Sequence, residues 1–221
     1  MSVTYNVIDS GNPLQQNGAI DWSRIDPDAD CHDYPLMHQI CRNIESRGEW
    51  TNFTSYDRYN LLKHFMKVKD CKSILEIGVE NNPNHLTSTS VFLGSKDDNT
   101  KYFGVDIEDK SSIRNEEKNI FTIQTRSENI DEVMAYLNSK GVTEIDFLFI
   151  DGWHSINQVI KEFEYTKWLS PNGIVGFHDT NHHPGPKYFL EQVIDRNVWE
   201  VVECPGDNPM YDFGVAFAWR K

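Results

Sequence analysis

The sequence lacks the features that mark secreted or membrane-inserted proteins. It contains no apolar run of about eighteen residues, and residues 1 to 20 carry no basic stretch followed by an apolar one. We therefore expect a protein of the cytoplasm. Cysteine is scarce as well, and the four cysteines include no C-x-x-C pair. Neither a zinc ribbon nor a dithiol redox motif can be argued from them.

Basic residues are few compared with acidic ones. The chain has 21 Lys and Arg against 34 Asp and Glu, which gives a formal net charge of −13 at pH 7. A charge of this sign repels phosphate backbones and anionic membrane surfaces. We expect neither nucleic acid nor a membrane as a partner, and a small neutral or cationic molecule as the substrate. A homo-oligomer remains open.

The length of 221 residues fits one α/β domain with a small terminal addition. Residues 1–70 are expected to form an N-terminal arm and a helical cap, because apolar residues recur at helical spacing between positions 34 and 69. Residues 71–221 are expected to form the main domain.

Beyond position 70, short apolar runs alternate with amphipathic segments, a pattern typical of βα units around a mostly parallel sheet. The last two runs are expected to form an antiparallel hairpin. The sequence thus predicts a Rossmann-like, seven-stranded, mostly parallel sheet. The expected strands are 73–78, 102–106, 120–124, 145–150, 173–177, 198–204 and 213–220, and the expected helices are 86–93, 129–139, 156–168 and 187–195.

The first two expected strands each end in residues suited to binding a nucleotide-like ligand. Gly78 follows the first strand, where a glycine lets the backbone approach a ligand closely, although Asn81 and Asn82 stand where further glycines usually follow. Asp106 ends the second strand, where a carboxylate can accept hydrogen bonds from ribose hydroxyls. A helix cap is the alternative role for this acid.

The fourth and fifth expected strands deliver acids and histidines to the same edge of the sheet. Asp151 and His154 follow one strand, and His178 and Asp179 follow the other. Paired carboxylates suit a hard divalent cation, or a general base beside a charge stabiliser. His182 and His183 also lie near Asp179 in sequence, which leaves a transition-metal site as an alternative.

The span from Ser73 to Arg220 resembles class I S-adenosylmethionine-dependent methyltransferases, in particular the branch of small-molecule and sugar O-methyltransferases and cephalosporin hydroxylase-like proteins. The resemblance rests on five ordered motifs, of which D-G-W-H-S is the most specific. They are Glu76-Ile77-Gly78-Val79, Gly104-Val105-Asp106-Ile107, Asp151-Gly152-Trp153-His154-Ser155, Ser170-Pro171-Asn172-Gly173 with Phe177-His178-Asp179-Thr180, and Phe213-Gly214-Val215-Ala216.

The resemblance implies S-adenosylmethionine as the cofactor and O-methylation of a hydroxylated small molecule or sugar as the reaction. The cofactor-binding residues it implies are Glu76, Gly78, Asp106, Ile107, Ser127 and Asp151, with Ser127 at the adenine end.

The resemblance also implies a site at Asp151, Asp179 and Asn181 for Mg²⁺, which can assist methyl transfer in such enzymes. Thr180 stands where metal-dependent relatives have a second acid or amide. For catalysis we expect His154 to take the proton of the acceptor, Asp151 to orient it, and His178 to serve as the alternative base.

Two other classes of function stay open. An NAD-dependent oxidoreductase is favoured by the acid after the second strand and opposed by the incomplete G-x-G-x-x-G pattern. A non-catalytic binding module is favoured by the altered loop from Glu80 to Asn82.

Overall fold

The structure of the chain is a computed structural model. It describes residues 15–16, 19–29, 55–80, 82, 86–180, 183–204 and 214–221. Residues 34–54 of the expected helical cap, residues 205–213 between the last two strands, and Asn81, Asn181 and His182 lie outside these ranges. Within the described ranges, every helix is too short or too polar to cross a bilayer.

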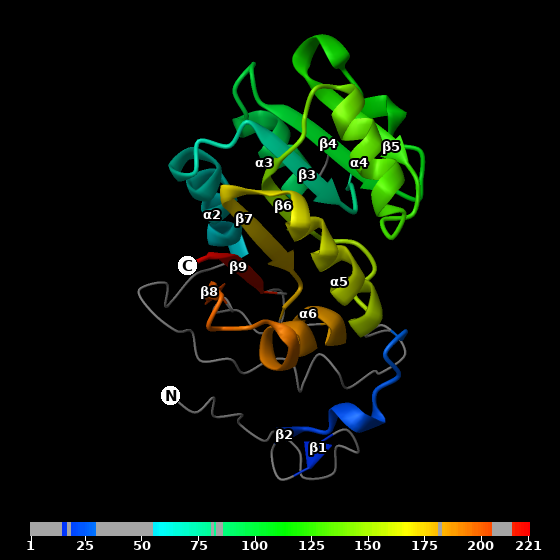
Figure 1. Cartoon of the computed structure of the whole chain (residues 1–221), viewed down its shortest axis with the longest axis vertical. Coiled ribbons are helices and arrows are strands. Elements are labelled where there is room, and N and C mark those ends of the chain that lie inside the picture. The colour runs from blue at the N-terminus through cyan, green and yellow to red at the C-terminus, as the bar shows by residue number, and fades with distance from the viewer. Residues whose placement is uncertain are drawn as a thin grey trace.

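The described residues contain a seven-stranded sheet with the order β5-β4-β3-β6-β7-β9-β8 (Figure 1). The strands from β5 to β7 are parallel, and β9 and β8 complete the sheet as antiparallel neighbours. The chain reverses its direction of travel across the sheet between β3 and β6, where open α/β sheets bind ligands. The strands are β3 (Ser73–Ile77), β4 (Lys101–Asp106), β5 (Ile120–Gln124), β6 (Ile145–Ile150), β7 (Leu169–His178), β8 (Trp199–Cys204) and β9 (Val215–Arg220).

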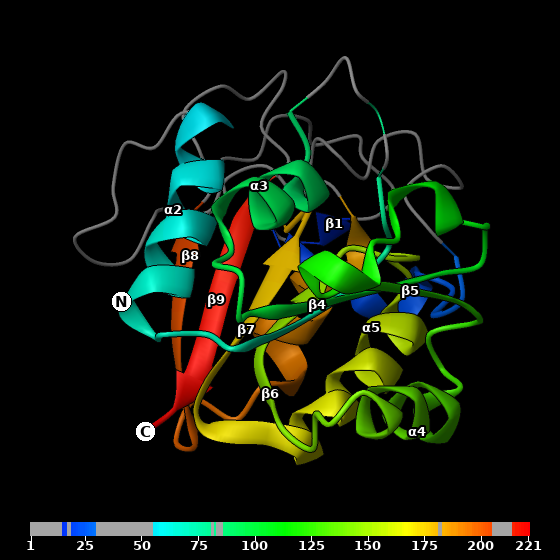
Figure 2. The same cartoon turned by 90° about the horizontal axis from the view of Figure 1, so that it is seen from above.

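Helices cover both faces of this sheet (Figure 2). Helices α2 (Ser55–Val68) and α3 (Ser88–Ser95) pack on one face, and α4 (Ile130–Ser139) and α5 (Ile156–Glu162) pack on the other. The central strand β6 is buried on both sides, which explains its nearly continuous apolar run.

The predicted fold class is confirmed, and most element bounds agree with the apolar pattern to within two residues. The exceptions lie around β7, which begins at Leu169, and at two helices. The segment expected as one helix over 156–168 ends as α5 at Glu162 and continues as a 3-10 helix. Helix α6 (Pro184–Tyr188) begins earlier than expected because Pro184 starts its first turn, and a π-helical turn follows at Phe189–Val193.

Helix α2 belongs to the core of the main domain rather than to a separate cap. Leu61, Leu62, Phe65 and Met66 are buried among residues of α3 and the sheet, and the Phe65 ring lies 4.4 Å from that of Phe217 in β9. Helix α2, which lies before the boundary predicted at residue 70, therefore packs on the sheet. The short segments β1 (Gln15–Gln16), β2 (Ala19–Ile20) and Trp22–Arg24 precede it.

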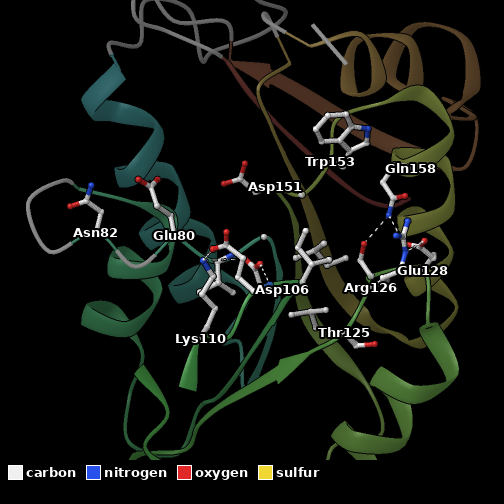
Figure 3. Close-up of a pocket in the computed structure, with 18 residues that line it drawn as sticks. Glu80, Asn82, Asp106, Lys110, Thr125, Arg126, Glu128, Asp151, Trp153 and Gln158 are labelled. Carbon is white, nitrogen blue, oxygen red and sulfur yellow. Dashed lines mark hydrogen bonds and ion pairs between the residues drawn. The ribbon is translucent and has the colours of Figure 1, made fainter. Parts of the chain in front are cut away.

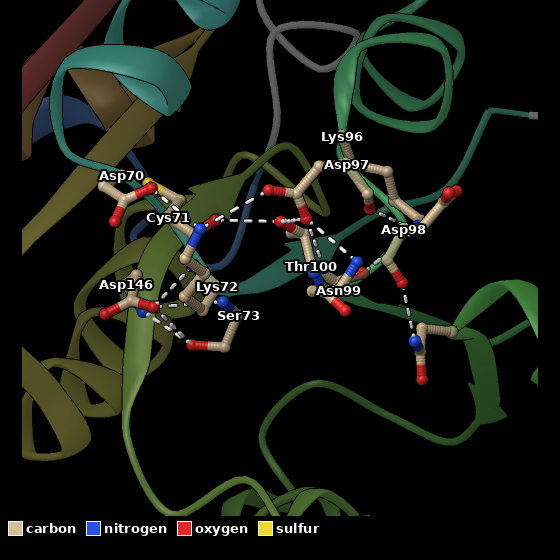
Figure 4. A network of polar contacts seen from close by, with 11 residues as sticks. Asp70, Cys71, Lys72, Ser73, Lys96, Asp97, Asp98, Asn99, Thr100 and Asp146 are labelled. Carbon is tan, nitrogen blue, oxygen red and sulfur yellow. Dashed lines mark hydrogen bonds and ion pairs between the residues drawn. The ribbon is translucent and has the colours of Figure 1, made fainter.

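A carboxylate ties together the strand starts at the edge opposite the strand carboxyl ends (Figure 4). Asp146 Oδ2 accepts hydrogen bonds from the backbone N–H groups of Lys72 (2.8 Å) and Ser73 (3.0 Å), while its Oδ1 accepts one from Ser170 Oγ (2.7 Å). One side chain thus fixes the entries to β3 and β7 against β6. Nearby, Asp97 caps the turn before β4 by accepting from the N–H of Thr100 at 2.7 Å.

Replacing Asp146 with alanine removes both carboxylate oxygens, so the backbone N–H groups of Lys72 and Ser73 lose their hydrogen-bond acceptor. We expect Asp146→Ala to lower the free energy of unfolding by about 2 to 3 kcal/mol, the range for hydrogen bonds to a charged group. Urea unfolding monitored by circular dichroism measures it. Glu200→Ala is the control, because Glu200 is half exposed and its ion pair with Lys221 spans 3.9 Å; it should change stability by less than about 0.5 kcal/mol.

Candidate active site

A cavity of about 800 Å³ lies beyond the carboxyl ends of β3, β4, β5 and β6 (Figure 3). Glu80 and Asn82 stand on one side, Glu128 and Gln158 on the opposite side, and Asp106 between them. The volume lies within the range of small-molecule and cofactor sites. The wall combines apolar side chains, acids, amides and two cations, and its members are Ile77, Gly78, Val79, Glu80, Asn82, Val105, Asp106, Ile107, Glu108, Lys110, Thr125, Arg126, Ser127, Glu128, Asp151, Gly152, Trp153 and Gln158.

Gly78 shapes the cavity floor, and the requirement for glycine there comes from the sheet itself. Its φ is +82°, and a Cβ atom at this position would lie 2.0 Å from the backbone oxygen of Asp151. The sequence analysis explained Gly78 by the close approach of a ligand. In the structure, Gly78 is required because the end of β3 lies close to the end of β6. Gly78 also lines the cavity, so a ligand could contact the same backbone.

Glu76 lies beneath this loop, fully buried and outside the cavity wall. Its carboxylate accepts hydrogen bonds from Ser88 Oγ (2.5 Å), Thr89 Oγ1 (2.8 Å) and the Tyr102 hydroxyl. Burial raises the pKa of Glu76 to about 7, an effect that these hydroxyl donors partly offset. Glu76 thus anchors the start of α3.

Asp106 lines the cavity at the end of β4 and holds two backbone segments. Its Oδ2 accepts from the N–H of Val79 and its Oδ1 from the N–H of Glu108, both at 2.8 Å. Lys110 Nζ lies 3.6 Å from Oδ2, and both side chains are largely shielded from solvent. Each carboxylate oxygen keeps a second lone pair, so Asp106 can still accept from ligand hydroxyls.

Ser127 stands on the far wall of the cavity, supported from behind by a buried acid. Its hydroxyl donates to Glu162 Oε1 (2.6 Å) and accepts from Gln158 Nε2 (2.8 Å). Tyr165 fixes its carbonyl through a hydroxyl donated at 2.7 Å. Glu162 is fully buried, and burial raises its pKa to about 7.

A cluster of histidines and acids lies beside the cavity, where β6 and β7 end. His178 Nδ1 is 3.0 Å from Asp151 Oδ1 and 2.9 Å from Asp179 Oδ1. His154 Nε2 lies 3.6 Å from Asp151 Oδ1, and its Nδ1 lies 3.8 Å from Asp179 Oδ2. His183 completes the cluster, with Nε2 3.2 Å from Asp179 Oδ2. Asp151 is shared between this cluster and the cavity.

The cluster separates its histidines by charge. Burial lowers the pKa of His154, so this imidazole is neutral near pH 7. Burial also opposes protonation of His178, but the carboxylates of Asp151 and Asp179 raise its pKa well above the usual value. The His178 side chain is therefore protonated and positively charged near pH 7, whereas the His154 side chain can still accept a proton.

Two backbone features hold the cluster in place. Asp179 has a φ of +56°, which is uncommon for a residue other than glycine and is found at functional turns. Gly185 donates its N–H to the His154 carbonyl (2.9 Å), and a Cβ there would lie 2.4 Å from that oxygen. The start of α6 thus packs directly on the chain at His154, and the rings of His154 and His183 lie 4.5 Å apart.

The N-terminal segment reaches the mouth of the cavity. The carbonyl oxygen of Asp28 lies 3.4 Å from Trp153 Nε1, and its carboxylate accepts from Asn157 Nδ2 at 2.8 Å. Trp153 lines the cavity and keeps 53% of its surface exposed. The described part of the arm therefore borders the site, as a segment that shapes an acceptor pocket would.

The structure brings the predicted site residues into one cavity and one adjoining cluster. Gly78, Asp106, Ile107, Ser127 and Asp151 line the cavity, and Glu76 lies behind it. The cluster contains the predicted Asp151, His154, His178 and Asp179. Asn181 lies outside the described residues.

The sequence analysis missed three residues of the site, namely Lys110, Gln158 and Glu162. Lys110 stands four residues after Asp106, so its spacing could have indicated a contact. Gln158 and Glu162 are four apart on one helical segment facing Ser127, which the helical period also allows.

The strand order, the acid at the end of β4 and the ligand-sized cavity at the switch point define a Rossmann-like fold of the class I methyltransferase type. Residues 76–180 match the family model described as a methyltransferase domain. The resemblance inferred from the sequence is thereby confirmed for this span, which covers 105 of the 221 residues. No curated protein sequence matches the chain.

Solved structures of methyltransferases share this fold. An O-methyltransferase from Bacillus cereus in complex with SAH is 16% identical, with a TM-score of 0.53 over 77% of this chain and 84% of that one. TomG, an O-methyltransferase from Streptomyces achromogenes in complex with SAM, is 16% identical, with a TM-score of 0.51 over 75% and 80%. The chain spans only 53% of MycE, a methyltransferase from the mycinamycin biosynthetic pathway solved with Mg, SAH and mycinamycin VI (75% of this chain, 17% identity, TM-score 0.49).

The buried Glu162 gives a prediction about stability and pH. In the folded chain the Glu162 carboxyl group has a pKa of about 7, whereas the ordinary pKa of a glutamate side chain is 4.5. The contribution of protonated Glu162 to the stability of the folded chain is fully present below pH 4.5 and is lost as the pH rises through 7. Glu162→Gln removes this loss, so relative to the natural chain it should gain stability between pH 5 and 8, by up to about 3 kcal/mol.

Urea unfolding at several pH values measures this difference. Glu117→Gln is the matched control because Glu117 is exposed, and its difference from the natural chain should stay constant with pH. A constant difference for Glu162→Gln as well would contradict the prediction.

Proposed function

We propose that the chain is an S-adenosylmethionine-dependent O-methyltransferase that acts on a hydroxylated small molecule, such as a sugar unit. One observation carries this proposal: within a methyltransferase domain, a cofactor-sized cavity containing Asp106 adjoins a neutral buried imidazole, His154, across the shared Asp151. The cavity suits the cofactor, and the cluster suits removal of a proton.

The cavity offers complementary groups for each part of S-adenosylmethionine. Asp106 retains lone pairs for ribose hydroxyls. Ile107, which is 69% exposed, offers an apolar surface to the adenine ring, and Ser127 stands beyond it on the far wall. Asp151 and Glu80 supply negative charge near the part of the cavity that would receive a sulfonium cation. The chain's residues therefore fit the cofactor.

The chemistry asks the protein mainly to position an acceptor oxygen and secondarily to remove its proton. The bound cofactor supplies an electrophilic methyl group on a sulfonium centre. His154 takes the proton, because it is neutral near pH 7 and buried against two carboxylates that stabilise its protonated form. Asp151 orients the acceptor hydroxyl, and His178, already protonated, balances the charge of the two acids.

Magnesium assistance rests on Asp151 and Asp179, whose carboxylates meet at His178. These oxygens suit Mg²⁺, but the neighbouring donors are imidazole nitrogens, which suit it poorly. No step of the proposed mechanism passes through the ion. We therefore expect EDTA to leave methyl transfer undiminished; loss of activity restored by Mg²⁺ would assign proton removal to an ion-bound hydroxyl instead.

The net charge of the chain and the Trp153 side chain at the mouth of the cavity support the proposed class of acceptor. A net charge of −13 disfavours polyanionic substrates, and Trp153 offers an exposed ring face beside the cluster. Aromatic side chains of this kind pack against the apolar faces of sugars and ring systems.

Cofactor binding tests the role of Asp106. Asp106→Ala should weaken binding of S-adenosylhomocysteine by about 1.5 to 3 kcal/mol, which is roughly 10- to 150-fold. Isothermal titration calorimetry measures the affinity, and Asp131→Asn, which removes an exposed acid on α4, should leave it unchanged. Binding of NAD in place of S-adenosylhomocysteine would favour an oxidoreductase, and binding of neither would favour a non-catalytic module.

Turnover tests the role of His154. His154→Ala should lower the rate of methyl transfer by about 10²- to 10⁴-fold, the usual contribution of a general base, with cofactor affinity nearly unchanged. His64→Ala is the control because His64 is exposed on α2. Transfer of the labelled methyl group from the cofactor to an array of sugars and phenols is the assay. A fully active His154→Ala variant would remove His154 from the mechanism and assign proton removal to another group.

A further inference from the structure

The cluster beside the cavity contains more nitrogen donors than proton removal requires. His154, Asp179 and His183 each present one ligand atom, and these atoms lie within 4.8 Å of one another. His154 and His183 are both more than nine-tenths buried. We propose that these three residues form a binding site for a divalent transition-metal ion of the Zn²⁺ type.

The distances are close to those of a metal-ligand set. Oδ2 of Asp179 lies 3.2 Å from His183 Nε2 and 3.8 Å from His154 Nδ1. Tetrahedral ligands bound to zinc at 2.0 to 2.1 Å lie about 3.3 to 3.4 Å from one another. The contact between Asp179 and His183 already has nearly this length, and the contact between Asp179 and His154 would have to shorten. The His154 contact is too long for a hydrogen bond.

A second observation is the set of buried polar atoms that remain unsatisfied. Within the described part of the chain, His154 Nε2, His178 Nδ1 and Asp179 Oδ1 have no hydrogen-bond partner of acceptable geometry. These atoms border the proposed site, whose own ligand atoms are His154 Nδ1, Asp179 Oδ2 and His183 Nε2. Buried polar atoms without partners are uncommon and often mark a missing ion or water. His178 Nδ1 and Asp179 Oδ1 lie 2.9 Å apart.

The donor chemistry selects the class of ion. Two imidazoles and one carboxylate suit zinc and other first-row transition metals, whereas Mg²⁺ prefers a shell of oxygens. Asp151 and His178 stand beside the site, and their position gives the primary ligands neighbours to orient them.

The fold builds this set from segments far apart in sequence. The positive φ of Asp179 turns the chain after β7, and Gly185 allows α6 to approach the carbonyl of His154. His183 thereby meets Oδ2 of Asp179, whereas His178 meets Oδ1. Strain at Asp179 and close contact at Gly185 are costs that a binding site can explain.

Occupation of the site has a consequence that rests on the proposed function. A metal ion bound to His154 uses the nitrogen lone pair through which its imidazole ring would take a proton. Metal binding and the role of His154 as a base therefore exclude one another, and a bound transition metal should inhibit methyl transfer.

Direct binding tests the site without relying on catalysis. The full chain, freed of metal with EDTA and dialysed, is titrated with Zn²⁺ in a calorimeter, with Co²⁺ absorption as a second readout. We expect one ion per chain at this site, and weakening of at least about tenfold in His183→Ala and in Asp179→Asn. Asparagine tolerates positive φ, so the latter variant keeps the turn.

His64→Ala, on the surface of α2, should bind Zn²⁺ as the natural chain does. Millimolar Mg²⁺ should fail to displace the metal. Absence of Zn²⁺ binding, unchanged binding in both ligand variants, or displacement by Mg²⁺ would each overturn the proposal. A chain that binds Zn²⁺ but transfers no methyl group even when freed of metal would retain the metal site and refute the proposed function, whereas methyl transfer without Zn²⁺ binding would do the reverse.

Discussion

The close approach of β3 and β6 at Gly78 is the constraint on which the site depends. The Gly78 N–H donates to the Val105 carbonyl of β4, and the Asp151 N–H donates to the Ile77 carbonyl, both at 2.9 Å. A side chain at position 78 would collide with the backbone of Asp151. Three strand ends are thus held together at one point, which places Asp106 on one side of the loop and Asp151 on the other.

The carboxylates of Glu76 and Asp106 hold the loop after β3 in place. Glu76 fixes the start of α3, and Thr89 of that helix accepts from the N–H of Glu80 at 3.2 Å. Asp106 fixes the same loop from β4 through Val79. These contacts explain how the loop is ordered at Val79 and Glu80 without the glycines usual in this position. Buried acids are costly unless hydrogen-bonded, and these acids are retained where they position a loop.

The elements of the sheet could be predicted because a parallel strand buried on both faces has a continuous apolar run. Ile145–Ile150 is an instance, and its predicted bounds match those observed. The beginning of β7 could not be found in this way, because Pro171, Asn172 and Gly173 are not apolar; the register between β6 and β7 shifts between Ile145 and Phe147. Ser170, which bonds to Asp146, marks that irregular start.

The candidate site was predictable to the extent that it lies at strand ends. Asp106, Asp151 and Asp179 follow strands directly, so sequence position alone brought them to one edge. His183 depends instead on how α6 packs against His154, and Glu162 on which face of its helix meets Ser127; such tertiary contacts leave little trace in a single sequence. Asp151 borders both the cavity and the histidine cluster, and the two functions proposed for that cluster need opposite states of His154. A proton acceptor needs a free nitrogen lone pair, and a metal ligand gives that pair away. The ions available to the protein would then help decide which function the cluster serves.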